Sequence, residues 1–252
     1  MRQASLSGLS LAALLAVPAV AHAQTLAQRI DRVKDGTVRL SYAARPGVCG
    51  NGRNISTHDG GRRDEWQSDC EEGPVRLVVE RREGRITDLR AYVGGHWRGT
   101  ADADLGQVPA REAGQWLLAV AEAGGRAAEE AVFPATLADS MEAWPGLLRI
   151  ARSDKAEKKT RKSAIFWLGQ AAADAATRGL DSIAVDDDED REVRESAIFA
   201  LSQRPHEEGI PVLIRIARSS KDPKLRRTAL FWLGQSEDPA ALRLFEELLS
   251  GS

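Results

Sequence analysis

Three near-identical octets in the C-terminal half of the chain decide the fold: SAIFWLGQ at 163–170, SAIFALSQ at 196–203 and TALFWLGQ at 228–235. They begin 33 and then 32 residues apart. A second set of related apolar segments alternates with them: LLRIARS at 147–153, LDSIAVD at 180–186 and LIRIARS at 213–219. Each repeat unit therefore predicts two helices, an A helix followed by a B helix that carries the octet.

A single helix pair of this size cannot bury its apolar side alone, so the pairs must stack into a solenoid. A degenerate first pair occupies 108–139, where Pro134 replaces the tryptophan of the octet. The segment DPAALRLFEELLS at 238–250 supplies a last A helix. The predicted fold class is therefore mostly α, with about four helix pairs forming an α-α superhelix over 107–252.

Two of the units, at 190–220 and 222–250, resemble HEAT repeats, and most closely the short bacterial phycobilisome-lyase HEAT-like repeats. They share with these repeats an aspartate at the turn, a Val/Leu-Arg element and the Ala-x-x-x-Leu-Gly signature, with Ser202 in place of its glycine in the first unit. The resemblance is firm over 140–250 and weak over 108–139. It implies an armadillo-like superhelix that binds another protein, and the layout of the whole chain is similar to exported bacterial HEAT-repeat domain proteins.

The N-terminus has the features of a secretory signal peptide over 1–23. Arg2 precedes an apolar run, and Ala21-His22-Ala23 supplies the small residues of a cleavage site before Gln24. The run is too short for a transmembrane helix, and no later segment is apolar enough to span a membrane. We therefore expect a periplasmic or secreted protein without a membrane span.

The chain has two cysteines, Cys49 and Cys70. An even pair in an exported chain predicts a disulfide, which would stabilise the intervening loop by about 3 kcal/mol in the chain-entropy model. A metal pair or a catalytic nucleophile is the alternative, but the two cysteines lack the CxxC spacing of such sites.

Residues 24–106 predict a small antiparallel β domain clipped by this disulfide. Polar and apolar residues alternate in three segments: TVRLSYAA at 37–44, PVRLVVE at 74–80 and RITDLRAYV at 85–93. A short helix is expected within 25–35, and a linker over 96–107 joins the sheet to the helices.

Two sets of arginines recur in the repeats. Arg161, Arg194 and Arg226 stand at the starts of successive B helices, where they either pair with turn carboxylates such as Asp190 and Asp222 or form a ladder that contacts a partner. The A helices carry a second set that we expect to be solvated: Arg149, Arg152, Arg215 and Arg218.

Trp167 and Trp232 occupy equivalent octet positions, with Ala200 between them. Either they form core between repeats, or they bind a partner, because tryptophan is enriched in interaction hot spots. The B-helix face is the expected contact surface, because its residues and turns vary least between units.

No catalytic constellation is recognisable. Enzymes of the HEAT-like deoxyhypusine hydroxylase type present several His-Glu pairs to two iron ions, whereas this chain has only His206-Glu207. The acidic run DDDED at 186–190 lacks the spacing of a calcium loop. We therefore expect neither a metal site nor a cofactor, and no enzymatic activity. The alternatives are an enzyme or enzyme subunit of the HEAT-like lyase or hydroxylase (oxidoreductase) type, and an activity that lies in the sheet and cysteine loop.

The formal net charge of −2 argues against a general nucleic-acid binder, which would carry a basic excess. The sequence predicts a monomeric, non-catalytic scaffold or regulator in the cell envelope that binds another protein along the superhelix.

Overall fold

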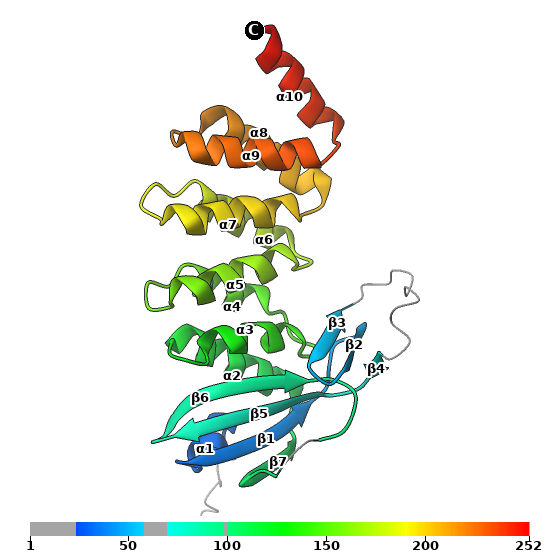
Figure 1. Ribbon diagram of the computed structural model, residues 1–252, viewed down its shortest axis with the longest axis vertical. Helices are drawn as coiled ribbons and strands as arrows, with labels where there is room; N and C mark the ends of the chain where they lie inside the picture. The colour runs from blue at the N-terminus through cyan, green and yellow to red at the C-terminus, as the bar shows by residue number, and fades with distance from the viewer. Residues whose placement is uncertain (1–23, 58–69, 98–99, 252) are drawn as a thin grey trace, which may run out of the picture.

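The computed structural model describes residues 24–57, 70–97 and 100–251 and shows a stack of helix pairs built on a small β structure (Figure 1). The predicted signal peptide and most of the cysteine loop lie outside these residues. The A and B helices alternate as the octets predict: α2 (Ala110–Ala123) and α3 (Ala128–Thr136), α4 (Trp144–Ala151) and α5 (Lys158–Gly169), α6 (Asp174–Ala184) and α7 (Arg191–Ser202), α8 (His206–Ser219) and α9 (Pro223–Gln235), and the last A helix α10 (Pro239–Ser250).

Aspartates at the turns start three of these helices. The side chain of Asp190 accepts a hydrogen bond from the backbone of Glu192, and Asp222 and Asp238 cap α9 and α10 in the same way. Such caps satisfy backbone N–H groups that have no partner within the helix. The turns therefore fix where each helix begins.

The three predicted strands are confirmed, but the N-terminal region contains more strands than about three. The larger sheet has the order β6-β5-β1-β7 and consists of β1 (Gly36–Tyr42), β5 (Val75–Arg82), β6 (Arg85–Tyr92) and β7 (Ala103–Gln107). The smaller sheet has the order β3-β2-β4 and consists of β2 (Val48–Asn51), β3 (Asn54–Thr57) and β4 (Glu71–Glu72). The short helix α1 (Leu26–Asp31) precedes them.

The expected linker over 96–107 is wrong in its second half, because 103–107 is the edge strand β7. It pairs with β1 in parallel, so the larger sheet is not wholly antiparallel. The strand is mostly exposed, and its ADLGQ sequence lacks the apolar alternation that marks a half-buried strand. Backbone hydrogen bonds hold it instead, with Val108 N donating to Ser41 O over 2.8 Å at its end.

One face of the larger sheet packs into the core. Val38, Leu40 and Tyr42 of β1 are opposite Val79, Leu77 and Val75 of β5, and all six side chains are buried. These residues belong to one continuous hydrophobic cluster that extends through the helices to Leu244 of α10. The expected domain bounds at 24–106 and 107–252 stay a prediction.

The first B helix, α3, joins the stack to the sheet. Pro134 stands where later octets have tryptophan or alanine, and its carbonyl accepts a 2.6 Å hydrogen bond from the buried hydroxyl of Tyr42. Beyond α3, Leu137 O accepts from Arg45 N, and Asp139 N donates to Ala43 O. The degenerate first repeat thus replaces an aromatic contact with a connection to β1.

Candidate interaction surface on the B helices

Aromatic side chains form a continuous ladder along the B helices. The Trp167 ring of α5 lies 4.6 Å from Phe133 of α3 and 5.0 Å from Phe166 of its own helix. Phe166 stacks on Phe199 of α7, with 6.3 Å between ring centroids. The aromatic ladder is continued in α9, where Trp232 lies 4.9 Å from Phe199 and 5.0 Å from Phe231.

The ladder contains both half-buried tryptophans and exposed phenylalanines. Trp167 and Trp232 are half-buried and contact the preceding repeat, so they are inter-repeat packing residues with one side at the surface. Phe166 is 39% exposed and Phe231 is 58% exposed. From the sequence we identify the two tryptophans but neither exposed phenylalanine, although a phenylalanine stands at the same octet position in every B helix.

Close helix packing supports the ladder between α5 and α7. An added Cβ at Gly169 would lie 3.0 Å from both the Cβ and the carbonyl oxygen of Ala200. The alanine that replaces tryptophan in the second octet therefore leaves room for α5 and α7 to approach each other. At Gly234, the equivalent glycine of α9, the nearest atom would be 3.8 Å away, on Phe245.

Charges alternate between neighbouring B helices beside the ladder. Lys159 and Lys162 of α5 lie 3.8 Å from Glu129 of α3 and Glu192 of α7, respectively. Lys158 reaches Asp190 at 2.9 Å, and this contact, a hydrogen bond, is the main reason why the pKa of Asp190 lies below its usual value. A shallow groove of about 590 Å³ is lined by these three lysines, the two glutamates and Phe166.

The B-helix arginines contact the ends of the A helices. The Nε atoms of Arg161 and Arg194 donate to the carbonyls of Ala151 and Ala184 over 2.9 and 3.0 Å, and Arg226 donates to Ser220 O over 2.7 Å. The carboxylates that pair with the first two are Glu189 and Asp187.

The prediction that these arginines pair with Asp190 and Asp222 is therefore wrong. Both aspartates are N-caps, whose carboxylates face the helix starts rather than the A-helix ends. Asp190 forms an ion pair with Lys158 instead. Asp222 forms one with Arg191, whose Nε atom lies 2.7 Å from a carboxylate oxygen of Asp222. The contacts of Arg161, Arg194 and Arg226 support the structural alternative. Partner binding by these arginines stays a prediction.

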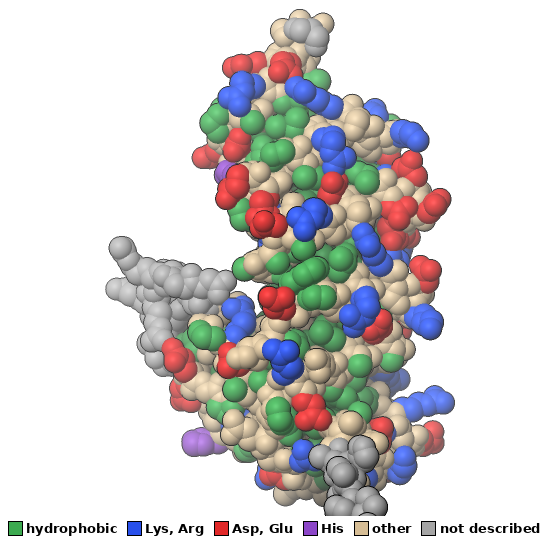
Figure 2. Space-filling view, turned by 180° about the vertical axis from the view of Figure 1, so that it is seen from behind, with side chains coloured by type: hydrophobic (Ala, Val, Ile, Leu, Met, Phe, Trp, Pro, Cys, Tyr) green, Lys and Arg blue, Asp and Glu red, His purple; other side chains and the backbone are tan. Residues whose placement is uncertain are grey.

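The A-helix arginines are exposed and connect successive A helices. Arg149 of α4 lies 3.2 Å from Glu122 of α2, and Arg152 hydrogen-bonds Ser182 of α6. Arg215 and Arg218 of α8 pair with Asp181 and Glu247. In the view from behind, basic and acidic side chains accordingly lie next to each other along the stack (Figure 2). Exposed pairs of this kind each contribute little to stability.

A buried arginine that the repeat pattern did not predict, Arg204, holds the turn between α7 and α8. It donates to Thr177 Oγ1 over 2.8 Å, to Ala173 O over 3.2 Å and also to Ala171 O, and it pairs with Glu208 at 2.8 Å. The equivalent positions 171 and 236 hold alanine and serine. Repeat analysis missed Arg204 because it does not recur.

His206 and the acidic clusters were the remaining candidates for a metal or catalytic site. His206 is exposed at the start of α8, with its Nδ1 3.4 Å from Asp238. Among the described residues, no three His, Cys, Asp or Glu side chains are grouped so as to hold a metal ion. In the same part of the chain, no helix is both long and apolar enough to cross a membrane.

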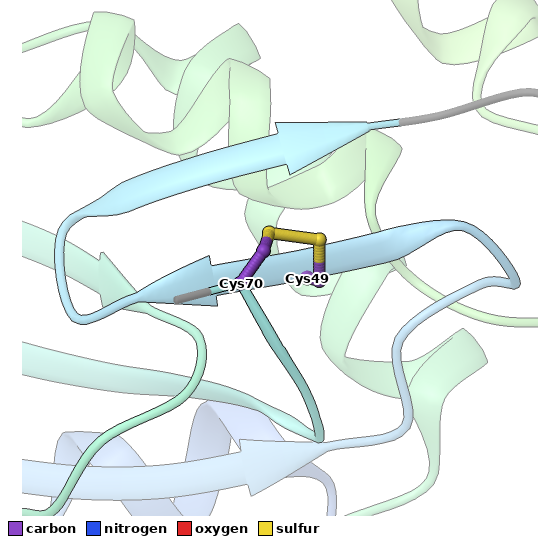
Figure 3. The surroundings of a disulfide bond; sticks show 2 residues. All are labelled: Cys49 and Cys70. Atoms are coloured by element: carbon purple, nitrogen blue, oxygen red, sulfur yellow. A yellow bond between two sulfur atoms is a disulfide. The ribbon is translucent and has the colours of Figure 1, made fainter. Parts of the chain in front are cut away.

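The expected disulfide is present. Cys49 of β2 is bonded to Cys70, which immediately precedes β4, with 5.3 Å between the Cα atoms (Figure 3). Cys49 also pairs through its backbone with Glu72, so the bond and the strand pairing reinforce each other. The disulfide thereby fixes the smaller sheet at both ends of the cysteine loop.

A comparison with protein-family models matches residues 177–252 to HEAT repeats. The match covers the last helices of the stack, from within α6 onwards, and agrees with the repeats observed in the structure. HEAT repeats are typically non-catalytic scaffolds for protein interaction. A search of curated proteins found no match to this chain.

Proposed function

We propose that this protein is a non-catalytic scaffold or regulator of the cell envelope that binds another protein through the aromatic ladder. The observation that carries the proposal is the ladder itself, in which Phe166 and Phe231 expose aromatic surface beside half-buried tryptophans. Aromatic side chains, phenylalanine included, are enriched in protein interfaces, and tryptophan is enriched among interaction hot spots.

The partner that fits is a protein segment with an apolar side. Its apolar side chains cover Phe166 and Phe231, and its acidic groups meet the three lysines of α5 that line the groove beside Phe166. Lys158, Lys159 and Lys162 are each between 43% and 48% exposed, so they are accessible to such a segment while they pair with neighbouring carboxylates.

Site-specific photo-crosslinking tests this proposal. A photoreactive phenylalanine analogue at Phe231 should capture a defined partner, whereas the same analogue at Val185, which is 44% exposed and outside the ladder, should not. Untagged wild-type protein should compete for the crosslink, and protein with Phe166→Ser and Phe231→Ser should not. Equal capture from both positions, or equal competition by both proteins, would contradict the proposal.

A binding measurement with the identified partner separates contact from folding. Each phenylalanine substitution should weaken binding by roughly 30-fold or more, because hot-spot truncations cost about 2 kcal/mol or more. The exposed Phe231→Ser variant should keep the melting temperature of the wild type. Export is tested separately, since the envelope protein should be recovered with Gln24 as its first residue.

A further inference from the structure

A second cavity lies on the outer face of the larger sheet, far along the chain from the aromatic ladder. Its floor is formed by Arg76, Val78 and Tyr92, which alternate with the core-facing residues of β5 and β6. The turn between β2 and β3 forms one wall, and residues 95–97 form the other. The backbone pairing of Gly52 with Val93 holds these walls together. The cavity has a volume of about 380 Å³, which is within the usual range for small-molecule sites.

The charged side chains that the described residues contribute to this lining are all basic. Arg53, Arg76 and His96 contribute cationic or imidazole groups, and none of the described residues that line the cavity carries a carboxylate. Arg76 is oriented by a hydrogen bond to the carbonyl of Gly94. Arg53 is exposed, and within the described part of the chain its guanidinium has no hydrogen-bond or ion-pair partner. The site is therefore prepared for an anionic group.

The lining also presents flat aromatic surface. The Trp97 ring lies over two guanidinium groups, 5.3 Å from Arg39 and 5.4 Å from Arg76. Arg39 is in turn paired at 2.8 Å with Asp104. These cation–π contacts hold the indole over the sheet, and Tyr92 adds a second ring. A ligand with a planar or apolar body can pack on them while its anionic group meets the arginines.

We propose that this cavity binds a small carboxylate ligand whose charged group is attached to a planar ring. The carboxylate contacts Arg53 and Arg76, and the ring packs against Trp97. This site is independent of the aromatic ladder, and its occupancy does not require the protein partner.

Nuclear magnetic resonance of the ¹⁵N-labelled, disulfide-bonded protein tests the site with benzoate as the probe. The indole resonance of Trp97 is identified by its loss in Trp97→Phe. Benzoate should shift this resonance in a saturable manner, whereas neutral benzamide, which has the same ring, should not. Arg53→Gln should weaken benzoate binding by about 10-fold, as expected for a hydrogen bond to a charged group.

The matched control is Arg243→Gln, which removes an exposed arginine of α10 far from the cavity and should leave benzoate affinity unchanged. Inorganic phosphate serves as an anion without a ring and should bind more weakly than benzoate. The proposal is overturned if benzoate produces no saturable shift of the Trp97 resonance, if benzamide or phosphate binds as tightly as benzoate, or if both arginine substitutions have the same effect.

Discussion

At the scale of single residues, two equivalent glycines have opposite surroundings. Gly169 lies against Ala200, whereas Gly234 has only ordinary contact with Phe245. We expect Gly169→Ala to destabilise the fold by about 1–2 kcal/mol, because overpacking exceeds the gain in helix propensity. Gly234→Ala should instead stabilise it by about 0.5–1 kcal/mol. Urea unfolding measures both, and two changes of the same sign would show that the approach of α5 to α7 is not tight.

The residue scale also shows what repeat analysis can detect. The disulfide was predictable because the chain has a single pair of cysteines and they lack the CxxC spacing of a metal or redox site. A phenylalanine stands in every octet, but its exposure depends on how far neighbouring helices cover it, and only Phe166 and Phe231 are exposed. Arg204 was not predictable, since its role comes from carbonyls that only the folded turn brings together.

At the scale of the elements, Arg204 connects the end of α5, the start of α6 and the start of α8. Replacement with methionine removes the side-chain hydrogen bonds to Thr177, Ala171 and Ala173 and the ion pair with Glu208. We expect Arg204→Met to lower the free energy of unfolding by about 2–4 kcal/mol. Hydrogen exchange should also become faster in residues 170–177.

The matched control for that substitution is Arg178→Met, which removes an exposed arginine from the middle of α6. It should change the free energy of unfolding by less than about 0.5 kcal/mol. If both methionine variants were equally stable, the turn would not depend on the buried guanidinium.

Helices and strands differed in how far the sequence predicted them. The helix pairs were predictable because the octets recur and because stacked pairs must share a core. The edge strand β7 and the smaller sheet were not, because their strands are short or exposed and are held by backbone pairing. The sequence predicted that the B-helix face is a contact surface, but it did not predict the ring contacts of the aromatic ladder. Those contacts depend on the offset between successive B helices.

At the scale of the whole molecule, the aspartates at the turns make the free energy of unfolding depend on pH in the acidic range. Hydrogen bonds from Arg191 and Lys158 are the main cause that lowers the pKa of Asp222 and Asp190, respectively. A carboxylate with a lowered pKa in the folded state stabilises the fold above its unfolded-state pKa. This contribution is lost as the pH falls through the folded-state value. The free energy of unfolding should therefore decline between about pH 5 and pH 2.

Asp222→Asn isolates one part of this pH dependence. Asparagine retains the N-cap of α9 but cannot titrate or pair with the charge of Arg191. Urea unfolding over the same pH range should give a shallower decline for the variant than for the wild type. Identical pH profiles would show that the ion pair between Asp222 and Arg191 does not contribute.

The lysines of α5 lie between the glutamates of α3 and α7, and this arrangement has a consequence for how such an array can grow. A tandem duplication of the α4–α5 unit would place lysine opposite lysine at the new junction. The copy would meet repulsion where the original has attraction. Inserting an acidic unit together with a basic one keeps every junction complementary. We therefore expect a copy of one unit to be accommodated slightly less well than a copy of two consecutive units, by the small amount that exposed ion pairs contribute.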